Sequence, residues 1–105
     1  MTWTLATDMP TYQRSEAFLK DYEVLDAADK ERFRRTVQEE FIPDLEAGGF
    51  RPGLRVKRVQ RARGVFEMTW APDGRATFMY GPEQVPHQPH IIWRRVGTHS
   101  IFKSP

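Results

Sequence analysis

Apolar residues in the first half of the chain recur at the three- and four-residue spacing of amphipathic helices. One run follows Ser15 and a second follows Asp26, and both residues suit the N-cap of a helix. The second run continues to Gly48-Gly49, where we expect the helix to stop, and Pro43 should kink it because proline lacks the N–H that continues the helical ladder. The apolar positions are Phe18, Leu19, Tyr22 and Leu25 in the first run and Phe33, Val37, Phe41 and Leu45 in the second.

Beyond Gly49 the hydrophobic period changes from helical spacing to two, and β-branched and aromatic residues gather between turn signals. A further short edge strand is predicted near the start of the chain, where Trp3 and Leu5 alternate before Pro10. Four strands are expected in the second half, at residues 54–59, 65–70, 75–80 and 90–96.

The segment Ala71-Pro72-Asp73-Gly74 predicts a tight hairpin between the second and third of these four strands. Proline suits the second position of a type I turn and glycine suits a positive φ, which indicates a three-residue loop with a bulge, in which Ala71 faces Arg75. This register pairs Trp70 with Ala76, Met68 with Phe78 and Phe66 with Tyr80. These residues would form one apolar face toward the helices, whereas a two-residue loop would mix the faces.

The opposite face of the same hairpin is polar, and it carries Glu67, Thr69, Arg75, Thr77 and Met79. Arg55 and Lys57 alternate with apolar residues in the preceding strand, so we expect both cations to join this face. The prediction is a charged sheet face that no helix covers. In the last strand, hydrophobicity leaves open whether residues 91, 93 and 95 or residues 92, 94 and 96 face the core.

Charge is divided unequally along the 105 residues. Residues 1–49 contain 6 Lys and Arg against 11 Asp and Glu, whereas residues 50–105 contain 10 against 3. A basic sheet held in register attracts phosphates, so the function is expected in the second half. The run of cations Arg51, Arg55, Lys57, Arg58, Arg61 and Arg63 favours phosphate contacts.

The composition excludes several classes of protein. The length and the 39% of apolar residues fit a single domain over residues 1–105, and the absence of cysteine excludes disulfides, thiolate metal sites and a cysteine nucleophile. No apolar run reaches membrane-spanning length and the first residues lack the features of a signal peptide, so we expect a cytoplasmic protein. His87 and His90 are three residues apart, but Pro86 and Pro89 favour a loop and no third ligand is evident, so no metal and no cofactor are expected.

The order of these segments resembles the RelE/ParE superfamily of toxins from bacterial type II toxin–antitoxin pairs. The resemblance covers nearly the whole chain, and it is carried by LRVKRV, GVFEMTW, DGRATFMYG and HIIWRRVGTHSIF. It implies an α+β fold with the order β-α-α-β-β-β-β, in which a short N-terminal strand and two helices precede a twisted antiparallel sheet and the helices pack on one face. By this resemblance Arg95 and His99 are placed on the open face.

The RelE-like branch implies a metal-independent endoribonuclease that cuts messenger RNA on the ribosome and that a cognate antitoxin protein restrains. In such chemistry the ribose 2′-hydroxyl attacks the neighbouring phosphorus, which requires a proton acceptor, cations and a proton donor. The resemblance assigns catalysis to Glu67 as base, Arg75 on the phosphate and His99 as acid. Contacts to RNA are expected from Arg55, Lys57, Arg58, Arg61 and Arg95.

This chain departs from the family pattern at several of these positions. Glu67 and Thr69 stand where RelE members carry lysines, and Phe102 stands near a place where some members have a tyrosine. Glu67 therefore has a second interpretation, as a cross-strand ion pair worth about 0.2–1 kcal/mol. Two other functions also stay open, namely inhibition of DNA gyrase by binding, as in the ParE branch, and a non-catalytic nucleic-acid-binding module.

Overall fold

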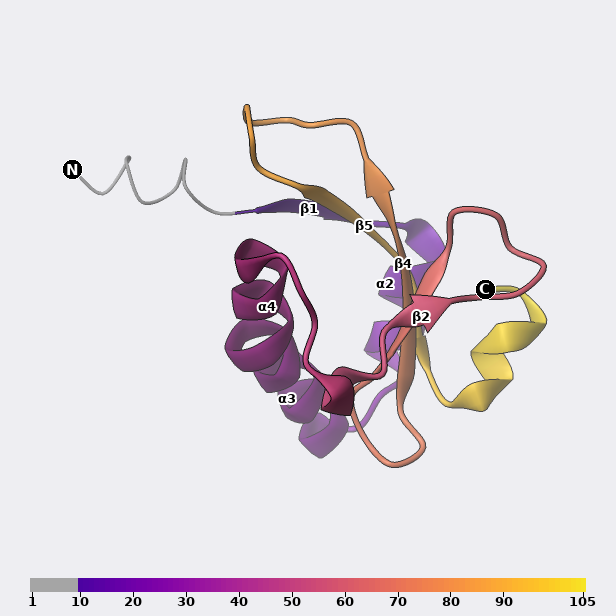
Figure 1. Ribbon diagram of the computed structural model, residues 1–105. Coiled ribbons are helices and arrows are strands. Elements are labelled where there is room, and N and C mark those ends of the chain that lie inside the picture. Colours follow the sequence, from indigo (N-terminus) through magenta and orange to yellow (C-terminus); the bar gives the residue numbers. More distant parts are fainter. Residues whose placement is uncertain (1–9) are drawn as a thin grey trace.

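The computed structural model describes residues 10–105, and the strand predicted at Trp3 and Leu5 lies outside them. One mixed sheet has the strand order β1-β5-β4-β3-β2 (Figure 1). The strands are β1 (Thr11–Arg14), β2 (Lys57–Arg58), β3 (Phe66–Thr69), β4 (Arg75–Gly81) and β5 (His90–Gly97). β1 runs parallel to β5, and every other neighbouring pair is antiparallel. The predicted α+β class and order of elements are confirmed, but the sheet predicted as antiparallel is mixed within residues 10–105, because β1 runs parallel to β5.

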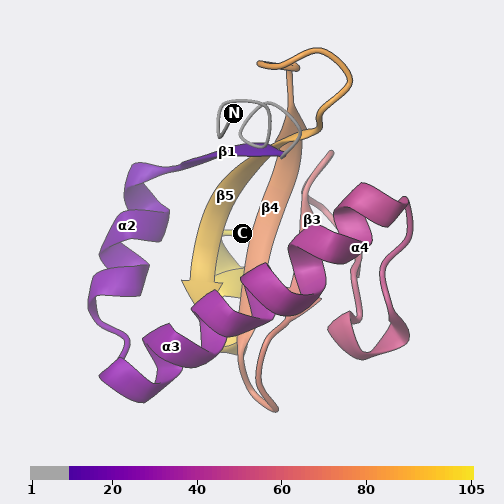
Figure 2. The ribbon, with the colours of Figure 1, turned by 90° about the vertical axis from the view of Figure 1, so that its left-hand side faces the viewer.

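The α-helices lie together on one side of the sheet, which we call the inner face (Figures 1 and 2). They are α2 (Glu16–Glu23), α3 (Ala27–Thr36) and α4 (Ile42–Ala47). The 3₁₀ helix η3 (His99–Lys103) lies on the opposite side, the outer face (Figure 1). Within residues 10–105, no helix has the length and apolarity needed to cross a bilayer.

The predicted helix boundaries are confirmed by their caps. Ser15 Oγ accepts the Phe18 N–H at 3.1 Å, and Asp26 Oδ1 accepts the Asp29 N–H at 2.8 Å. Gly48 ends α4 in the left-handed conformation at φ 89°. The expected interruption at Pro43 takes the form of a π-helical turn, η1 (Val37–Phe41), between α3 and α4. The wider turn accommodates the missing proline N–H without breaking the helical path.

Aromatic rings from the helices and the inner face make up the centre of the core. Phe41 lies 5.1 Å from Phe78 and 5.0 Å from Trp93 between ring centroids, and Phe33 lies 5.5 Å from Trp93. Met68, Ala76 and Phe78 have no exposed surface, as expected for the apolar face of the hairpin. Apolar burial on this side leaves the charged residues of the strands for the outer face.

The predicted register of the β3–β4 hairpin is wrong by one step on each strand. Thr69 pairs with Arg75, Met68 with Ala76 and Phe66 with Phe78, around the three-residue loop Ala71-Pro72-Asp73. The cause is Trp70, whose ring lies so close to Gly74 that a Cβ there would meet it at 2.6 Å. Glycine is needed for this close approach and not for a positive φ. Because the shift totals two residues, the inner and outer faces stay as predicted.

The predicted strand at 54–59 is much shorter in the structure. Pro52–Leu54 form a 3₁₀ turn, η2, and Arg55 follows in the left-handed conformation at φ 50°, so only Lys57 and Arg58 pair with β3. Leu54 is buried in the core, and the turn brings it there. The alternation of apolar and cationic residues over 54–57, which predicted a longer strand, thus belongs to a turn followed by a short edge strand.

A β-bulge in β5 decides the face that hydrophobicity left open. Thr77 pairs with Arg95 and Phe78 with Trp93, so Arg94 is the extra residue. Trp93 faces the core before the bulge and Val96 faces it after, and both are buried. Neither alternating series is correct over the whole strand, because the bulge shifts the alternation by one residue.

Replacing Ser15 with alanine should lower the free energy of unfolding by about 1–2 kcal/mol. The substitution removes the N-cap bond to Phe18, and it also removes the bond that Ser15 Oγ donates to the carbonyl of Arg94 at the bulge, 2.9 Å away. Urea unfolding followed by circular dichroism measures the change. Ser100 has an exposed hydroxyl outside the helix caps of the inner face. Ser100→Ala should change the free energy of unfolding by less than about 0.5 kcal/mol. Equal losses for the two variants would contradict this role of Ser15.

Candidate nucleic-acid interface

A row of polar residues crosses the outer face from β2 to β5. Lys57 pairs with Glu67, Glu67 with Thr77, and Thr77 with Arg95. Directly opposed side chains on one sheet face have Cβ atoms about 4.5–5.5 Å apart. The row therefore brings together a lysine, a carboxylate, a hydroxyl and a guanidinium from four strands.

Glu67 lies in this row on β3, between the edge strand β2 and the central strand β4. Its side chain is half-buried, and among residues 10–105 it forms no salt bridge within 4.0 Å. The interpretation of Glu67 as one half of a cross-strand ion pair thus has no direct support in this arrangement, although Lys57 is its cross-strand neighbour. A carboxylate in this setting can accept a proton or a hydrogen bond from a ligand.

Arg75 begins β4 on the same face, diagonal to Glu67, at a separation of about 7–8 Å for such positions. Its Nη1 donates to the carbonyls of Ala71, Pro72 and Gly74, at 3.3, 3.3 and 2.9 Å. Arg75 therefore holds the hairpin turn as well as contributing charge. Removal of Arg75 would therefore also remove bonds that shape this turn.

His99 is the first residue of η3 and lies beside the same turn. Its Nδ1 is 3.4 Å from Asp73 Oδ1, and its ring meets Phe102 edge to face at 5.5 Å. The imidazole remains largely exposed, with 62% of the side chain accessible. The turn at residues 71–75 thus brings His99 and Arg75, far apart in sequence, to one end of the outer face.

The outer face is not as open as predicted, because η3 and the residues after it cover part of it. Thr77 is completely buried, and its Oγ1 donates to the carbonyl of Pro105 at 3.0 Å. Arg95 Nη1 donates to the carbonyl of Ser104 at 3.0 Å. The prediction that no helix covers this face is wrong on its β4–β5 side, where the 3₁₀ helix η3 contacts both strands.

Arg95 also forms an ion pair with α2. Its Nε lies 2.6 Å from Asp21 Oδ2, and its Nη2 donates to Oδ1 at 3.1 Å. Hydrogen bonding to the Asp21 carboxylate raises the pKa of the Arg95 guanidinium above its ordinary value. Much of the charge of Arg95 is therefore balanced within the protein.

The other cations predicted to contact RNA do not share one surface. Arg58 has the opposite parity to Lys57 and stacks over the Phe66 ring at 5.8 Å, so it does not belong to the outer face. Arg61 lies in the β2–β3 loop at φ 69° and lines a hollow there together with Arg58 and Arg63. Arg55 is exposed in the turn before β2. Lys57 and Arg95 are the two members of the predicted set that the row contains.

His90 is a structural residue at the start of β5, as the strand predicted at residues 90–96 requires. Its Nδ1 is 2.7 Å from Thr11 Oγ1, and its Nε2 is 2.9 Å from Gln13 Oε1. Both ring nitrogens are engaged by β1, and the side chain is buried. His90 therefore fixes the parallel pairing of β1, while His87 remains exposed in the loop before β5.

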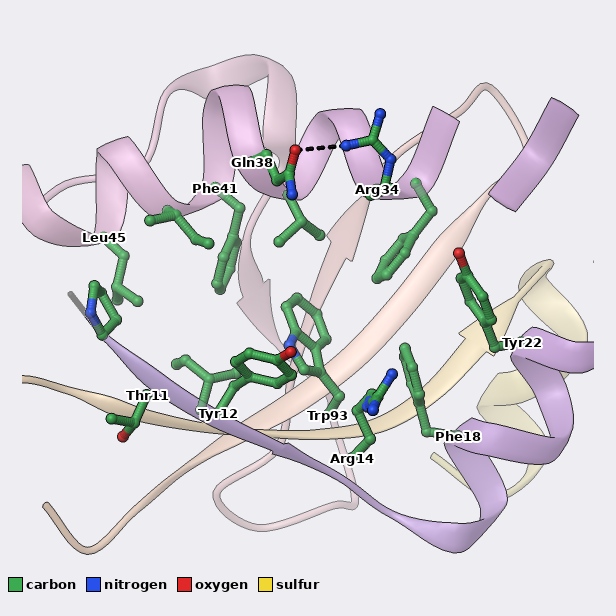
Figure 3. Close-up of a pocket in the computed structure, with 15 residues that line it drawn as sticks. Thr11, Tyr12, Arg14, Phe18, Tyr22, Arg34, Gln38, Phe41, Leu45 and Trp93 are labelled. Carbon is green, nitrogen blue, oxygen red and sulfur yellow. Dashed lines mark hydrogen bonds between the residues drawn. The ribbon is translucent and has the colours of Figure 1, made fainter. Parts of the chain in front are cut away.

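An apolar groove of about 210 Å³ lies on the inner side, between β1 and the helices (Figure 3). The side chains around it include those of Phe18, Tyr22, Phe41, Leu45 and Trp93. A polar contact at its rim joins Arg34 Nη1 to Gln38 Oε1 at 2.6 Å (Figure 3). The groove contains no carboxylate or imidazole among its lining residues, so the candidate chemistry belongs to the outer face.

Arg94 and Thr77 of the outer site, and Asp21, the ion-pair partner of Arg95 on α2, were not predicted from the sequence as site residues. The adjacent arginines at 94 and 95 were a signal, but alternation in a strand assigns neighbouring residues to opposite faces. Only the bulge places both beside Thr77. Asp21 was hidden because its partner is 74 positions away in the sequence.

Comparison with solved structures identifies the fold. The chain is similar to the E. coli DinJ-YafQ toxin–antitoxin complex, with a TM-score of 0.66, 14% identity, and coverage of 88% of this chain and 94% of the other. It is similar to the YoeB/ParE toxin from Agrobacterium tumefaciens, with a TM-score of 0.62, 11% identity, and coverage of 85% and 98%. It is also similar to HP0894 from Helicobacter pylori, with a TM-score of 0.61, 15% identity, and coverage of 88% and 97%.

No family model matches this chain, and neither does any curated protein. The similarity is therefore one of fold, over nearly the full length of both partners in each comparison. It confirms the fold that the resemblance to the RelE/ParE toxins predicted. Activity at this level of identity must be argued from the residues of the site.

Proposed function

We propose that this protein is the toxin of a bacterial type II toxin–antitoxin pair and that it cleaves messenger RNA on the ribosome. The fold shared with solved toxins supports the first part. The observation that carries the second part is the arrangement of Glu67, Arg75 and His99 around the β3–β4 hairpin of the outer face. These three residues supply a proton acceptor, a cation and a proton donor, the set that phosphodiester cleavage by the adjacent 2′-hydroxyl requires.

In the proposed reaction Glu67 removes the proton of the ribose 2′-hydroxyl, whose oxygen then attacks the adjacent phosphorus. The bond from phosphorus to the 5′ oxygen breaks, and His99 donates a proton to that leaving oxygen. The products are a 2′,3′-cyclic phosphate and a 5′-hydroxyl, so no water is consumed in this step. Arg75 and Arg95 stabilise the charge that develops on the phosphoryl oxygens, and Arg55 and Lys57 contact flanking phosphates.

The proposed partners are the ribosome carrying messenger RNA and a cognate antitoxin, and the proposed place of action is the cytoplasm. DinJ-YafQ was solved as a toxin–antitoxin complex, which supports an antitoxin for this chain. An acidic segment of that antitoxin would complement Lys57 and the cations of the β2–β3 loop. The whole of residues 1–105 is proposed to act as one domain.

Induced expression without an antitoxin tests this function. We expect arrested growth and messengers cut within their coding regions, and Glu67→Gln should relieve both because an amide cannot act as the base. Messenger cleavage is measured by primer extension on total RNA. Intact messengers together with a DNA-damage response would instead indicate gyrase inhibition. Normal growth with folded protein present would overturn the toxin assignment and favour a binding module.

A further inference from the structure

The bulge in β5 brings Arg94 and Arg95 to the same side of the sheet, opposite Thr77. Arg94 Nε and Thr77 Oγ1 donate to one and the same atom, the carbonyl oxygen of Pro105, at 3.1 and 3.0 Å. Arg95 Nη1 donates to the carbonyl of the preceding residue, Ser104, at 3.0 Å. Three donors from two strands thus converge on adjacent oxygen atoms.

The charges of the two arginines are balanced differently. Arg95 has the carboxylate of Asp21, whereas no Asp or Glu side chain within residues 10–105 forms a salt bridge with Arg94. The polar partners of the half-buried Arg94 guanidinium are the Pro105 carbonyl and the thioether of Met79, with Nη1 3.6 Å from Sδ. A hydrogen bond from a guanidinium to an anionic oxygen is about twice as strong as one between neutral groups. Two guanidinium groups and a hydroxyl that point their donors at adjacent oxygen atoms form a site suited to an anionic oxygen.

The position of these donors matters for the proposed reaction. Thr77 is the direct cross-strand neighbour of Glu67, so an oxygen held by Thr77 lies about one strand spacing from that carboxylate. A phosphate at this place would have its ester oxygens beside the proposed base. The geometry points to a site for a phosphodiester, and not to a simple anchor for the end of η3.

We propose that Arg94, Arg95 and Thr77 form a phosphate-binding site for the RNA backbone, and that Ser104 and Pro105 occupy it as an internal competitor. This inference rests on the proposed function for the identity of its ligand. RNA entering the outer face displaces these two residues, and its phosphate takes over the bonds that their carbonyls accept. The segment after η3 thereby weakens binding of RNA until the RNA is positioned to replace it.

Binding of a single-stranded 2′-O-methyl RNA, which cannot be cleaved, tests the site by fluorescence anisotropy. Arg94→Gln should weaken binding about tenfold, since loss of one charge-assisted contact is worth roughly 1.4 kcal/mol, a factor of ten. The slope of log affinity against log salt should fall by about 0.7, as expected for one phosphate contact with a single strand. Arg94→Lys keeps the charge, so its affinity for the RNA should lie between the affinities of the unmodified chain and of Arg94→Gln.

Arg32→Gln is the matched control, because it removes the same charge from an exposed position on α3. Its effect on affinity should stay within about twofold. An Arg94→Gln effect no larger than that of Arg32→Gln, in proteins with equal melting temperatures, would overturn the site. So would an absence of binding by the unmodified chain at roughly 50 mM salt.

Nuclear magnetic resonance of the unmodified chain tests the competition. The Ser104 amide donates to the Ile101 carbonyl at 3.1 Å, and displacement of the segment should shift its signal in parallel with that of Arg94 Nε–H as RNA is added. A Ser104 signal that stays unchanged at saturation would overturn the competitor role. Because the RNA is not cleavable, these results are independent of whether messengers are cut in cells. The site can therefore stand when the proposed activity fails, and the reverse also holds.

Discussion

Replacing His99 with alanine should lower the rate of messenger cleavage by about 10²- to 10³-fold, because the leaving oxygen then lacks a positioned proton donor. The fold should be unaffected. The imidazole is exposed, and its contacts are the Asp73 carboxylate and the edge of Phe102, both outside the core cluster. The free energy of unfolding is expected to change by less than about 0.5 kcal/mol. Cleavage is measured as the rate of appearance of cut messenger in a reconstituted translation mixture.

His87→Ala provides the control for this substitution. It also removes an exposed imidazole, but from the loop before β5, which supplies nothing to the row of the outer face. We expect its cleavage rate to remain within about threefold of the unmodified protein. If the two histidine variants cleave equally well, His99 is not the acid. Loss of activity accompanied by a large fall in melting temperature would show instead that η3 depends on His99 for its structure.

Arg75 is a less direct test of the same chemistry. Its guanidinium joins three carbonyls of the hairpin turn, so alanine at this position removes both a charge and the bonds that shape the turn. Asp73, the partner of His99, belongs to that turn. A loss of activity in Arg75→Ala would therefore mix a direct effect on the phosphate with a displaced acid. The comparison of His99 with His87 avoids this ambiguity.

Local signals predicted the elements that depend on neighbouring residues. Ser15 and Asp26 cap their helices because the bonds that they form span three residues, and such bonds can be read from the sequence. The faces of β3 and β4 were also predictable, since alternation is local and a shift of two residues preserves it. The apolar face of the hairpin therefore packs against the helices as expected, except at Tyr80, which is 44% exposed.

Features set by long-range packing were not predictable in the same way. The hairpin register depends on the Trp70 ring lying over Gly74, which is a matter of shape and not of turn propensity. The bulge at Arg94 depends on Ser15, whose hydroxyl and N–H bind the carbonyls of Arg94 and Trp93 from 79 and 78 positions away. Without that bulge, alternation places Arg94 and Arg95 on opposite faces. The part of the site formed by both arginines was accordingly missed.

Replacing Phe78 with alanine should lower the free energy of unfolding by about 3–5 kcal/mol, a large part of the 5–15 kcal/mol that stabilises a typical domain. Phe78 has no exposed surface, and its ring lies 5.1 Å from Phe41, 5.6 Å from Phe66 and 5.6 Å from Trp93 between centroids. Alanine would leave a cavity between the sheet and the helices α3 and α4. The large neighbouring rings cannot move far enough to fill that cavity. Urea unfolding followed by circular dichroism measures the loss.

Phe78→Leu keeps the experiment interpretable where the alanine variant fails to fold, because leucine fills most of the volume and should cost less. Leu19→Ala is the surface control. The Leu19 side chain is 46% exposed on α2, so this variant should lose much less free energy of unfolding than either Phe78 variant.

Phe78 follows Thr77 directly, and their side chains lie on opposite faces, so a collapse of the core around position 78 would move Thr77 relative to Glu67. Cleavage should therefore fall in Phe78→Leu by more than its folded fraction predicts. A strict proportion between activity and folded protein would mean that the outer face tolerates shifts of the core beneath it.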